Sequence, residues 1–315
     1  KTELAMVFQA RGLPREAEQK YLEVIALFEG QDKAAYSLGG GYEALAQLCE
    51  AEGRTAEAME AQRKAIAAWE QLAGETHEPQ YRFRQAWANE RLAALLVRAK
   101  ESAAAQEAYN KAVDVLEAFV REQPDHANHY FNCGLLRSAF ASELSTASNC
   151  DSAQKEFHEA IAAYTKVIEL APNNALAQNN LAWLYATCPE TELRDPAKAV
   201  ALAKRAVELR PTDGTGWNTL GAAQYRAGDW QAAVDSLTKS MELRSGGDAE
   251  DWYFLAMSHC RLGNVDDARK WHQQAVEWVE KNGPLLAGNR QVADELRRFR
   301  AEARELLGGE TSMNP

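Results

Sequence analysis

The sequence predicts an all-α fold, a right-handed α-solenoid of about seven stacked helix pairs with a C-terminal capping helix. Alanine accounts for 58 of the 315 residues. Alanine, together with the many Glu, Leu, Lys, Arg and Gln residues, favours helix because these side chains lose little entropy there. A pattern of small and apolar residues also recurs at offsets of 35 to 47 residues. A single helix pair cannot bury its apolar face, so repeated pairs stack into a continuous core.

The repeat is clearest in two adjacent copies in the second half of the chain. It begins with a tryptophan, followed after two intervening positions by a leucine and a small residue. A turn glycine and then an alanine in a second helix complete it. The two copies are Trp217, Leu220, Gly221, Gly228, Ala233 and Trp252, Leu255, Ala256, Gly263, Ala268. The small residues let the paired backbones approach closely, and larger residues such as Leu237 fill the remaining space.

The same pattern, with longer spacers, predicts one solenoid domain over residues 1–308. The helix pairs are expected near 1–30, 36–74, 81–122, 127–171, 175–210, 214–247 and 249–282, with the cap at 290–308 and a disordered tail at 309–315. An insertion at Thr187–Asp195 separates the two helices of the fifth pair. The cap is expected to pack on the last pair, where Trp271 and Trp278 would touch Phe299.

Local signals agree with these helix boundaries. Pro14 and Pro196 fall in the first turn of a predicted helix, where a missing N–H is harmless. Asp195 and Asp229 precede second helices and supply N-cap acceptors. Gly228 suits the left-handed residue that ends a first helix. Such agreement between local and global features is evidence for the fold as a whole.

The first pair is expected to be incomplete, because Lys1 falls inside its first helix. A helix without its start leaves apolar surface open at the end of the stack. We therefore expect either a fragment of a longer protein or a neighbouring chain over this end. If nothing covers it, the first ten or so residues should be poorly ordered.

These helix pairs resemble tetratricopeptide repeats (TPRs), and the longer offsets resemble the kinesin-light-chain-like kind. The second half resembles, more specifically, the TPR tails of large planctomycete bacterial proteins, which often follow a serine/threonine protein kinase domain. The segments concerned are NNLAWLYATCP at 179–189, LRDP at 193–196, WNTLG at 217–221, YRAGDW at 225–230 and ELRRFRAE at 295–302. The resemblance implies an accessory or regulatory region and no kinase activity, because the sequence lacks a Gly-rich phosphate loop, an HRD-type loop and a DFG motif.

The composition argues against several other classes of protein. A net charge of −11 argues against nucleic acid as a partner. No stretch is long and apolar enough for a membrane span, and the opening residues do not form a signal peptide. We therefore expect no direct membrane insertion and favour a cytoplasmic location. The five cysteines are widely spaced without a CxxC motif, which argues against a disulfide framework and a structural zinc site.

Two clusters invite a chemical interpretation. Gly39–Gly41 lacks the GK[ST] ending of a phosphate loop and follows no strand, so we expect these glycines to mark the start of a helix. His126, His129 and Cys133 are spaced to share a helical face, but no further ligand completes a known zinc pattern. The sequence therefore predicts no catalytic residue, no metal site and no cofactor, and it does not indicate an enzyme.

In the TPR family the first helix of each repeat lines a concave groove, so the resemblance implies a peptide-binding surface. In the second half of the chain, which matches the family better, the groove positions are occupied by Asn179, Trp183, Asn218, Tyr225, Arg226, Tyr253, Met257 and Arg261. Trp, Tyr and Arg are common at binding hot spots, and Asn amides can bond a peptide backbone. The sequence thus predicts a non-catalytic scaffold that binds a protein or peptide partner in this groove.

The charge of the groove positions differs between the two halves of the chain. Glu43, Glu50 and Glu90 would repel the carboxylate tails that some TPRs bind, so we expect the first half to accept basic or neutral segments. Arg226 and Arg261 offer positive charge in the second half. Replacing both arginines by Ala should weaken the binding of an acidic peptide.

Two other functions stay open. The repeats could form a structural spacer or a self-association module that stacks end to end through the open first repeat. Alternatively, the chain could be an enzyme with an unrecognised site at Gly39–Gly41 or His126–Cys133. Light scattering tests for self-association. Metal analysis and nucleotide-induced melting shifts test for an enzyme.

Overall fold

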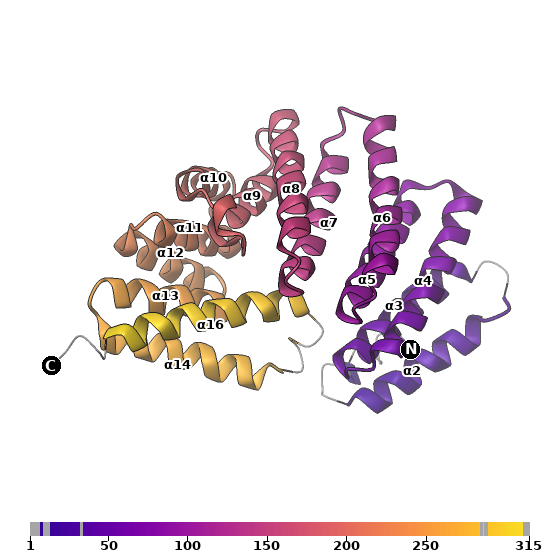
Figure 1. Ribbon diagram of the computed structural model, residues 1–315, viewed down its shortest axis with the longest axis horizontal. Coiled ribbons are helices and arrows are strands. Elements are labelled where there is room, and N and C mark those ends of the chain that lie inside the picture. The colour runs from indigo at the N-terminus through magenta and orange to yellow at the C-terminus, as the bar shows by residue number, and fades with distance from the viewer. Residues whose placement is uncertain (1–6, 9–12, 32–33, 284–285, 287–288, 311–315) are drawn as a thin grey trace. The chain divides into compact units, whose positions relative to one another are not determined.

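The computed structural model describes residues 7–8, 13–31, 34–283, 286 and 289–310. Over these residues the chain is helical between short turns and contains no β-strand (Figure 1). The helices are α2 (Pro14–Phe28), α3 (Ala35–Ala51), α4 (Thr55–Thr76), α5 (Pro79–Arg98), α6 (Ser102–Glu122), α7 (Ala127–Thr146), α8 (Cys150–Leu170), α9 (Ala175–Thr187), η1 (Thr191–Leu193), α10 (Pro196–Leu209), α11 (Gly214–Arg226), α12 (Trp230–Leu243), α13 (Ala249–Arg261), α14 (Val265–Lys281) and α16 (Arg290–Glu310). None of the described helices is long and apolar enough to cross a membrane.

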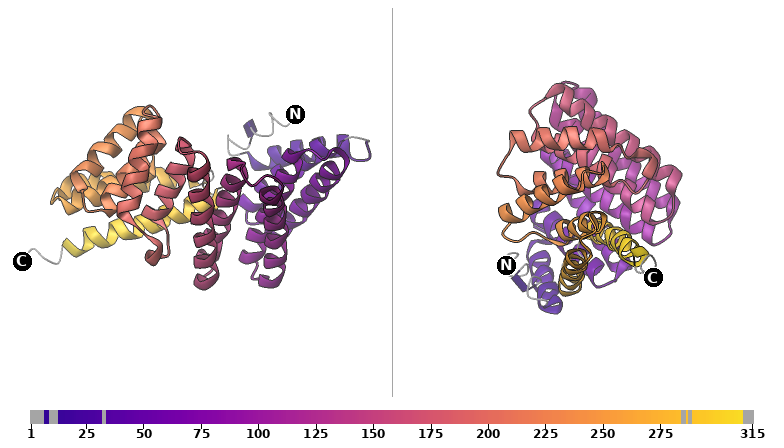
Figure 2. Two further views of the ribbon diagram at one scale, coloured as in Figure 1. Left: turned by 90° about the horizontal axis from the view of Figure 1, so that it is seen from above. Right: turned by 90° about the vertical axis from the view of Figure 1, so that its left-hand side faces the viewer.

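Packing divides the chain into two compact units, one ending at Asn149 and the other beginning at Cys150 and including α16. In the first unit, α3 packs against α4 and α5 against α6. In the second unit, α9 packs against α10, α11 against α12, and α13 against α14, and Figure 2 shows these pairs from two further directions. Within each unit the chain therefore has the predicted architecture of stacked helix pairs.

Alanines at the repeat's close-contact positions lie in the core, as the pattern predicts. Ala58, Ala93, Ala112, Ala233 and Ala268 have no exposed surface. Protein interiors are close-packed, so a larger side chain at such a position would push the paired helices apart. The high alanine content is thus explained by packing as well as by helix propensity.

The predicted helix boundaries are confirmed by the capping contacts. The carboxylates of Asp195 and Asp229 accept backbone N–H groups in the first turns of α10 and α12, at 3.0 and 3.4 Å. Pro14 and Pro196 each lie at the start of a helix. Gly228, just after α11, has a φ of +83°, a left-handed conformation that glycine adopts without strain.

From 36–74 onward the bounds of the individual helices agree with the predicted ones to within a few residues, which is the usual uncertainty at helix ends. The helices of the predicted pair at 127–171, α7 and α8, belong to different units, so that pair stays a prediction. The first helix of the first pair, and the predicted order of the first ten residues, lie largely outside the described residues. The predicted cap at 290–308 is α16, which extends to Glu310, so two residues of the predicted tail are helical. The rest of the tail, 311–315, lies outside the described residues. One array running through both units stays a prediction.

Gly39–Gly41 lies inside a helix and not at its start, which corrects the prediction. Helix α3 begins at Ala35. Gly39 lies against the indole of Trp69 in α4, and a Cβ at this position would be 2.6 Å from Cε2 of that ring. The glycine therefore permits a close approach of α3 to a buried tryptophan, a packing role that needs no phosphate.

Candidate functional site

The C-terminal helix α16 packs against α13 and α14 within the second unit (Figure 1). Its apolar face carries Leu296, Phe299 and Ala303 at helical spacing, and these residues are at most 2% exposed. Phe299 packs against Phe254 of α13, with ring centroids 4.9 Å apart. Trp278, predicted to touch Phe299, packs against a tryptophan of α13. The helix thus extends the core of the last helix pair.

Trp183 of α9 contacts the same face of α16. Its ring meets Phe299 edge to face, with centroids 6.1 Å apart and planes at 88°. It meets Phe254 in a similar way, at 6.3 Å and 73°. The indole Nε1–H also donates to Oε1 of Glu295 at 3.5 Å. Since edge-to-face contact is a favoured geometry for aromatic rings, α9, α13 and α16 share one aromatic cluster.

Arg226 of α11 binds Glu302 of α16 through both prongs of its guanidinium. Nη2 lies 2.7 Å from Oε2, Nη1 contacts Oε1, and the Tyr225 hydroxyl donates to Oε1 at 3.3 Å. Burial alone would raise the pKa of Glu302, but the hydrogen bonds and positive charge of Arg226 outweigh it and hold the pKa below its ordinary value. Burial raises the pKa of Tyr225 to about 12, so its phenol stays protonated and donates.

We call Trp183, Tyr225, Arg226 and Phe254 the groove surface, because they form the face of α9, α11 and α13 that α16 contacts. The first three are predicted binding residues, and the structure brings them together. Tyr225 and Phe254 are buried, and the other two are half-buried. A helix of the chain itself therefore lies where the sequence predicts a partner.

Of the other five predicted residues, Arg261 lies near this surface, because its positive charge acts on the Tyr225 phenol, and the remaining four have different surroundings. Asn218, Tyr253 and Met257 are at most 2% exposed, so their side chains belong to the packing between helices. Arg261 is exposed at the end of α13. Asn179 lines a pocket near the start of α9. Binding of a partner by any of the eight predicted residues stays a prediction.

Asn218 has a structural partner that the sequence did not indicate. Its Nδ2 donates to Oδ1 of Asp251 at 2.7 Å. Arg244 contacts the other carboxylate oxygen of Asp251 and donates to Asp248 at 2.6 Å. Burial raises the pKa of Asp251, and the charge of Arg244 opposes that rise. This network joins α11 to α13 and to the residue after α12.

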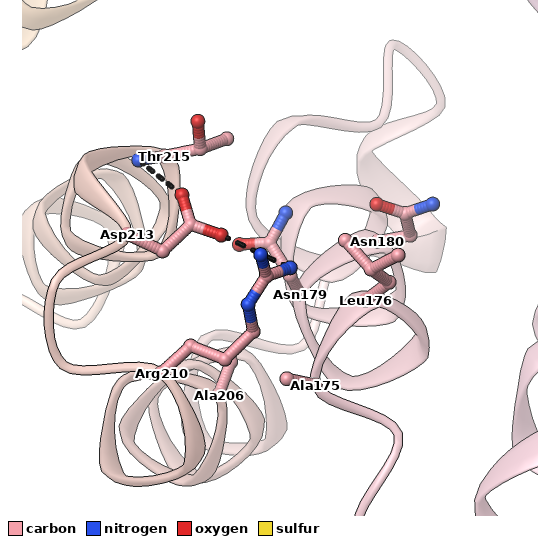
Figure 3. Close-up of a pocket in the computed structure, with 9 residues that line it drawn as sticks. Ala175, Leu176, Asn179, Asn180, Ala206, Arg210, Asp213 and Thr215 are labelled. Atoms are coloured by element: carbon pink, nitrogen blue, oxygen red, sulfur yellow. Dashed lines mark hydrogen bonds and ion pairs between the residues drawn. The ribbon is translucent and has the colours of Figure 1, made fainter. Parts of the chain in front are cut away.

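The pocket beside Asn179 has a volume of about 150 Å³ (Figure 3). It is lined by Ala175, Leu176, Asn179, Asn180, Ala206, Arg210, Asp213, Thr215 and Gly216. Oδ1 of Asn179 is buried and has no hydrogen-bond partner among the described residues. Arg210 pairs with Asp213 at 3.4 Å, and Asp213 accepts the Thr215 N–H at 3.1 Å. The volume is below the roughly 300 Å³ of ordinary ligand sites, so the pocket has room for one small group of a larger partner.

The acidic groove positions of the first unit have basic partners. Glu50 accepts a hydrogen bond from Arg91 at 3.1 Å and also contacts Arg98. Glu43 lies 3.6 Å from Arg84. Paired carboxylates repel an approaching anion less than free ones do. The expectation that these two residues repel a carboxylate tail stays a prediction, and the ion pairs within the unit reduce the repulsion to be expected.

Glu90, the third acidic position, is 6% exposed within α5. Burial raises its pKa to about 7, because a carboxylate loses its hydration when it is removed from water. At neutral pH its negative charge is thus only partly present. Glu90 therefore also contributes less repulsion than its position in the sequence suggested.

The cluster of His126, His129 and Cys133 takes part in packing. The two imidazole rings stack with centroids 4.3 Å apart, and His129 also stacks on Phe119 at 5.1 Å. Nε2 of His129 lies 3.3 Å from Oε1 of Gln123. Burial raises the pKa of Cys133 to about 11, which disfavours the thiolate that a metal would require. The arrangement is that of an aromatic stack at a helix start.

A different group of potential metal ligands occurs among the described residues. Oxygens of Glu18 and Glu57 and the sulfur of Cys49 lie within 4.8 Å of one another. Arg54 lies 2.9 Å from the first carboxylate and 2.8 Å from the second. Burial raises the pKa of Cys49 to about 11. An internal cation thus already balances the carboxylates, and the sulfur is held as a thiol.

Phe254, Glu295 and Glu302 are site residues that the sequence did not predict, and Phe299 was predicted only as part of the cap. One signal was available. Glu295, Phe299 and Glu302 are spaced four and three residues apart, which puts them on one face of a helix. That face carries an aromatic ring between two carboxylates, a chemistry that a cap on its own does not require.

Models of four TPR families match parts of the chain. Each is described as a tetratricopeptide repeat, and they match residues 42–79, 148–174, 163–201 and 191–247. These ranges fall on α3 and α4 in the first unit and on helices from α8 to α12 in the second. The repeats predicted from the residue pattern are thereby supported.

Two curated relatives resemble about a third of the chain. Hsc70-interacting protein 1 of Drosophila melanogaster is 33% identical over 114 residues, which is 36% of this chain and 28% of that protein. The heat-shock protein cognate co-chaperone sgt12 of Aspergillus fumigatus is 28% identical over 108 residues, which is 34% of this chain and 30% of that protein. The chain thus spans under a third of the length of these relatives.

A solved structure shows the same fold over almost the whole chain. A tetratricopeptide repeat protein from Parabacteroides merdae has a TM-score of 0.52 and 15% sequence identity, and the match covers 95% of this chain and 96% of that one. Identity at this level shows the fold alone. The helix pairs, the buried alanines and the family models agree, and the chain carries tetratricopeptide repeats within residues 42–79 and 148–247.

Proposed function

We propose that the chain is a protein-interaction scaffold without catalytic activity, and that it binds a protein or peptide partner on the groove surface. The repeats and the co-chaperone relatives support the scaffold. The contact with α16 carries the choice of site, because Trp183, Tyr225 and Arg226 already hold a helix by ring contacts and an ion pair. Trp, Tyr and Arg are the residue types most enriched at interface hot spots.

The chemistry of the surface favours a partner with negative charge. Arg226 and the exposed Arg261 supply cations on adjacent repeats. Asn179 and Asn180 line the pocket on the same helix, and Asn amides can bond a peptide backbone. We therefore expect acidic segments to bind better than basic ones, and the double change Arg226→Ala with Arg261→Ala to weaken them.

The names of the relatives make a chaperone one partner class to test. We expect weak binding of an acidic chaperone tail, because Arg226 is already engaged by Glu302 of the same chain. The resemblance to planctomycete kinase tails favours a place for the chain in a larger protein, as its accessory or regulatory region. Neither point changes the proposed site.

A peptide display library, selected on the full chain, tests the site before a natural partner is known. Selected peptides should lose at least about tenfold in affinity when Trp183→Ala and Tyr225→Ala are combined. Tyr185→Ala is the matched control, because this residue of α9 packs towards α10. Circular dichroism confirms that each variant is helical. Full affinity of the folded double variant would show that partners bind elsewhere.

The alternative of self-association has its own measurement. If the repeats stack end to end, the mass from light scattering rises with concentration and is insensitive to the groove substitutions. A constant monomeric mass over the range in which peptides bind favours the scaffold. A mass that rises without limit while no peptide binds would replace the scaffold by the self-association module.

A further inference from the structure

We propose that α16 is an internal ligand of the groove surface, and that the external partner presents an amphipathic helix with the same acidic–aromatic–acidic face, which competes with α16. This inference rests on the proposed function and specifies the chemistry of the partner. It commits to a helix in a groove, a recognition mode in which anchors at i, i+4 and i+7 carry the contacts. In α16 these anchors are Glu295, Phe299 and Glu302.

Each anchor meets a matching group on another helix. Glu295 accepts a hydrogen bond from Trp183, Phe299 fits against the rings of Trp183 and Phe254, and Glu302 binds Arg226. The central anchor is buried, and both outer anchors make polar contacts. A buried aromatic centre with polar contacts around it is the usual anatomy of a specific interface.

The reach of α16 exceeds what a cap requires. A cap covers the open face of the last pair, and packing on α13 and α14 does this. The side chains of α16 also contact α9 and α11: Arg298 donates to the Thr187 carbonyl at 3.0 Å, and Glu302 pairs with Arg226. These contacts lie at the groove positions of the two preceding repeats. Helix α16 therefore makes the contacts expected of a ligand bound in the groove, in addition to those of a cap.

The site requires a carboxylate at the position of Glu302. Burial lowers the pKa of Arg194, and the nearby charge of Arg226 lowers it further, whereas Glu302 raises it. Two guanidinium groups therefore lie close together, and the carboxylate of α16 offsets their repulsion. When α16 leaves, Arg226 loses its carboxylate partner, so a helix with an acidic group at this position is preferred over one without it.

One contact of α16 is poor enough to permit exchange. Glu295 is 9% exposed, and its hydrogen bond from Trp183 is long at 3.5 Å. Burial raises the pKa of Glu295, and burial with nearby acidic groups raises that of Glu250 to about 8. The charge of Arg298 and hydrogen bonds with Trp183 and Gln291 oppose the rise at Glu295 but do not cancel it, so burying this carboxylate still costs free energy. A partner helix with a better contact at this anchor can therefore outcompete α16, although α16 acts at a high effective concentration.

The test uses a fluorescent synthetic peptide of residues 290–310 and the full chain, with binding followed by anisotropy. The wild-type chain should bind the peptide weakly, because its own α16 covers the groove surface. A chain with Phe299→Ala should bind the wild-type peptide at least about tenfold more tightly. Arg297→Ala, on the exposed side of α16, is the matched control and should bind as weakly as the wild type. A peptide with Phe299→Ala should bind none of these chains.

A charge exchange provides a second test that does not depend on the Phe299 variant folding well. A chain with Glu302→Arg loses the pair with Arg226, and the wild-type peptide should then bind it more tightly than it binds the wild-type chain. A chain with Arg226→Glu alone is opened because its own Glu302 is repelled; it should not bind the wild-type peptide, and it should bind a peptide with Glu302→Arg. Failure of the 290–310 peptide to bind any helical, opened chain overturns the inference.

The outcomes separate this inference from the proposed function. If library peptides bind the groove surface and the 290–310 peptide does not, the internal-ligand idea fails and the scaffold stands. If neither binds, both fail. If the wild-type chain dimerises and Phe299→Ala abolishes the dimer, the occupant is a second copy of this chain, which overturns the external partner.

Discussion

Arg226 in α11 and Glu302 in α16, which are 76 residues apart, form a two-pronged ion pair with Nη2 and Oε2 2.7 Å apart. The arginine side chain is 11% exposed and the glutamate 31%. A pair this well shielded is screened by solvent less than an ordinary surface pair. It links the C-terminal helix to a repeat other than the one on which that helix packs.

A double-mutant cycle should measure this link. Arg226→Ala and Glu302→Ala, made singly and together, are expected to show a coupling of about 1–2 kcal/mol in urea unfolding. Lys239 and Glu242 form a matched exposed pair, 46% and 60% exposed, with an expected coupling below about 0.5 kcal/mol. Equal coupling in the two cycles would show that the α16 pair adds nothing beyond a surface contact.

The same pair predicts an acid dependence. The pKa of Glu302 is lower in the folded chain than in the unfolded one. The carboxylate therefore stabilises the folded chain above its unfolded pKa of about 4.3, and this stabilisation is lost as pH falls through the folded pKa. Between about pH 5 and 3 the wild type should therefore lose more unfolding free energy than Arg226→Ala does. Parallel curves for the two proteins over that range would contradict the assignment.

Glu90 predicts the opposite pH dependence. Burial raises its pKa to about 7 in the folded chain. The contribution of Glu90 to the free energy of unfolding is therefore fully present below its unfolded pKa of about 4.3, and it is lost as pH rises through 7. Glu90→Gln removes this loss. At pH 8 the variant should be more stable than the wild type by roughly 1–3 kcal/mol, and the difference should shrink towards pH 5. Chemical unfolding at both pH values measures it, and an unchanged difference would argue against a buried, protonated Glu90.

Gly39 and Gly40 form a matched pair in α3. A Cβ at Gly39 would lie 2.6 Å from the Trp69 ring, whereas a Cβ at Gly40 meets nothing within 4 Å. Gly39→Ala should therefore cost about 1–3 kcal/mol in unfolding free energy. Gly40→Ala should gain about 0.5–1 kcal/mol through helix propensity. Thermal and urea unfolding of both variants decide the matter, and a stabilised Gly39→Ala would refute the close contact.

The five cysteines should differ sharply in reactivity. Cys150 is exposed, and the other four are buried. Burial raises the pKa of Cys188 to about 12, so its reactive thiolate is scarce at neutral pH. In the native state a chromogenic disulfide should titrate one thiol rapidly, and Cys150→Ser should abolish that phase. In urea all five should react. Two or more fast thiols in the native wild type would contradict the described burial.

Much of the fold was predictable because its signals are local. Capping by Asp195 and Asp229, the first-turn position of Pro196 and the left-handed Gly228 each depend on a few neighbouring residues. The alanine pattern then fixed which helix faces meet, since only small residues allow the close approach seen at Ala233 and Ala268. Gly39–Gly41 were assigned to a helix start because glycine disfavours helix locally, whereas the contact of Gly39 with Trp69 is made in tertiary structure.

The candidate site was predictable only in part. The repeat register predicted Trp183, Tyr225 and Arg226 on one face, and in the structure all three contact α16; their binding of a partner stays a prediction. The register did not show that Asn218 donates a hydrogen bond to Asp251, or that Tyr253 is fully buried. A repeat position indicates which way a side chain points, but not how completely the neighbouring helices cover it. Those outcomes depend on which side chains from other helices reach the same place.

By itself, the sequence determined an all-α array of helix pairs, with its caps, turns and close-contact alanines, because each signal lies within one helix pair. Only the tertiary structure decided that α16 covers the predicted groove. The contact of Trp183 with Phe299 joins residues from helices that are distant in the chain. Such a contact depends on how successive pairs are arranged and on the length of the side chains, and no local pattern in the sequence encodes either.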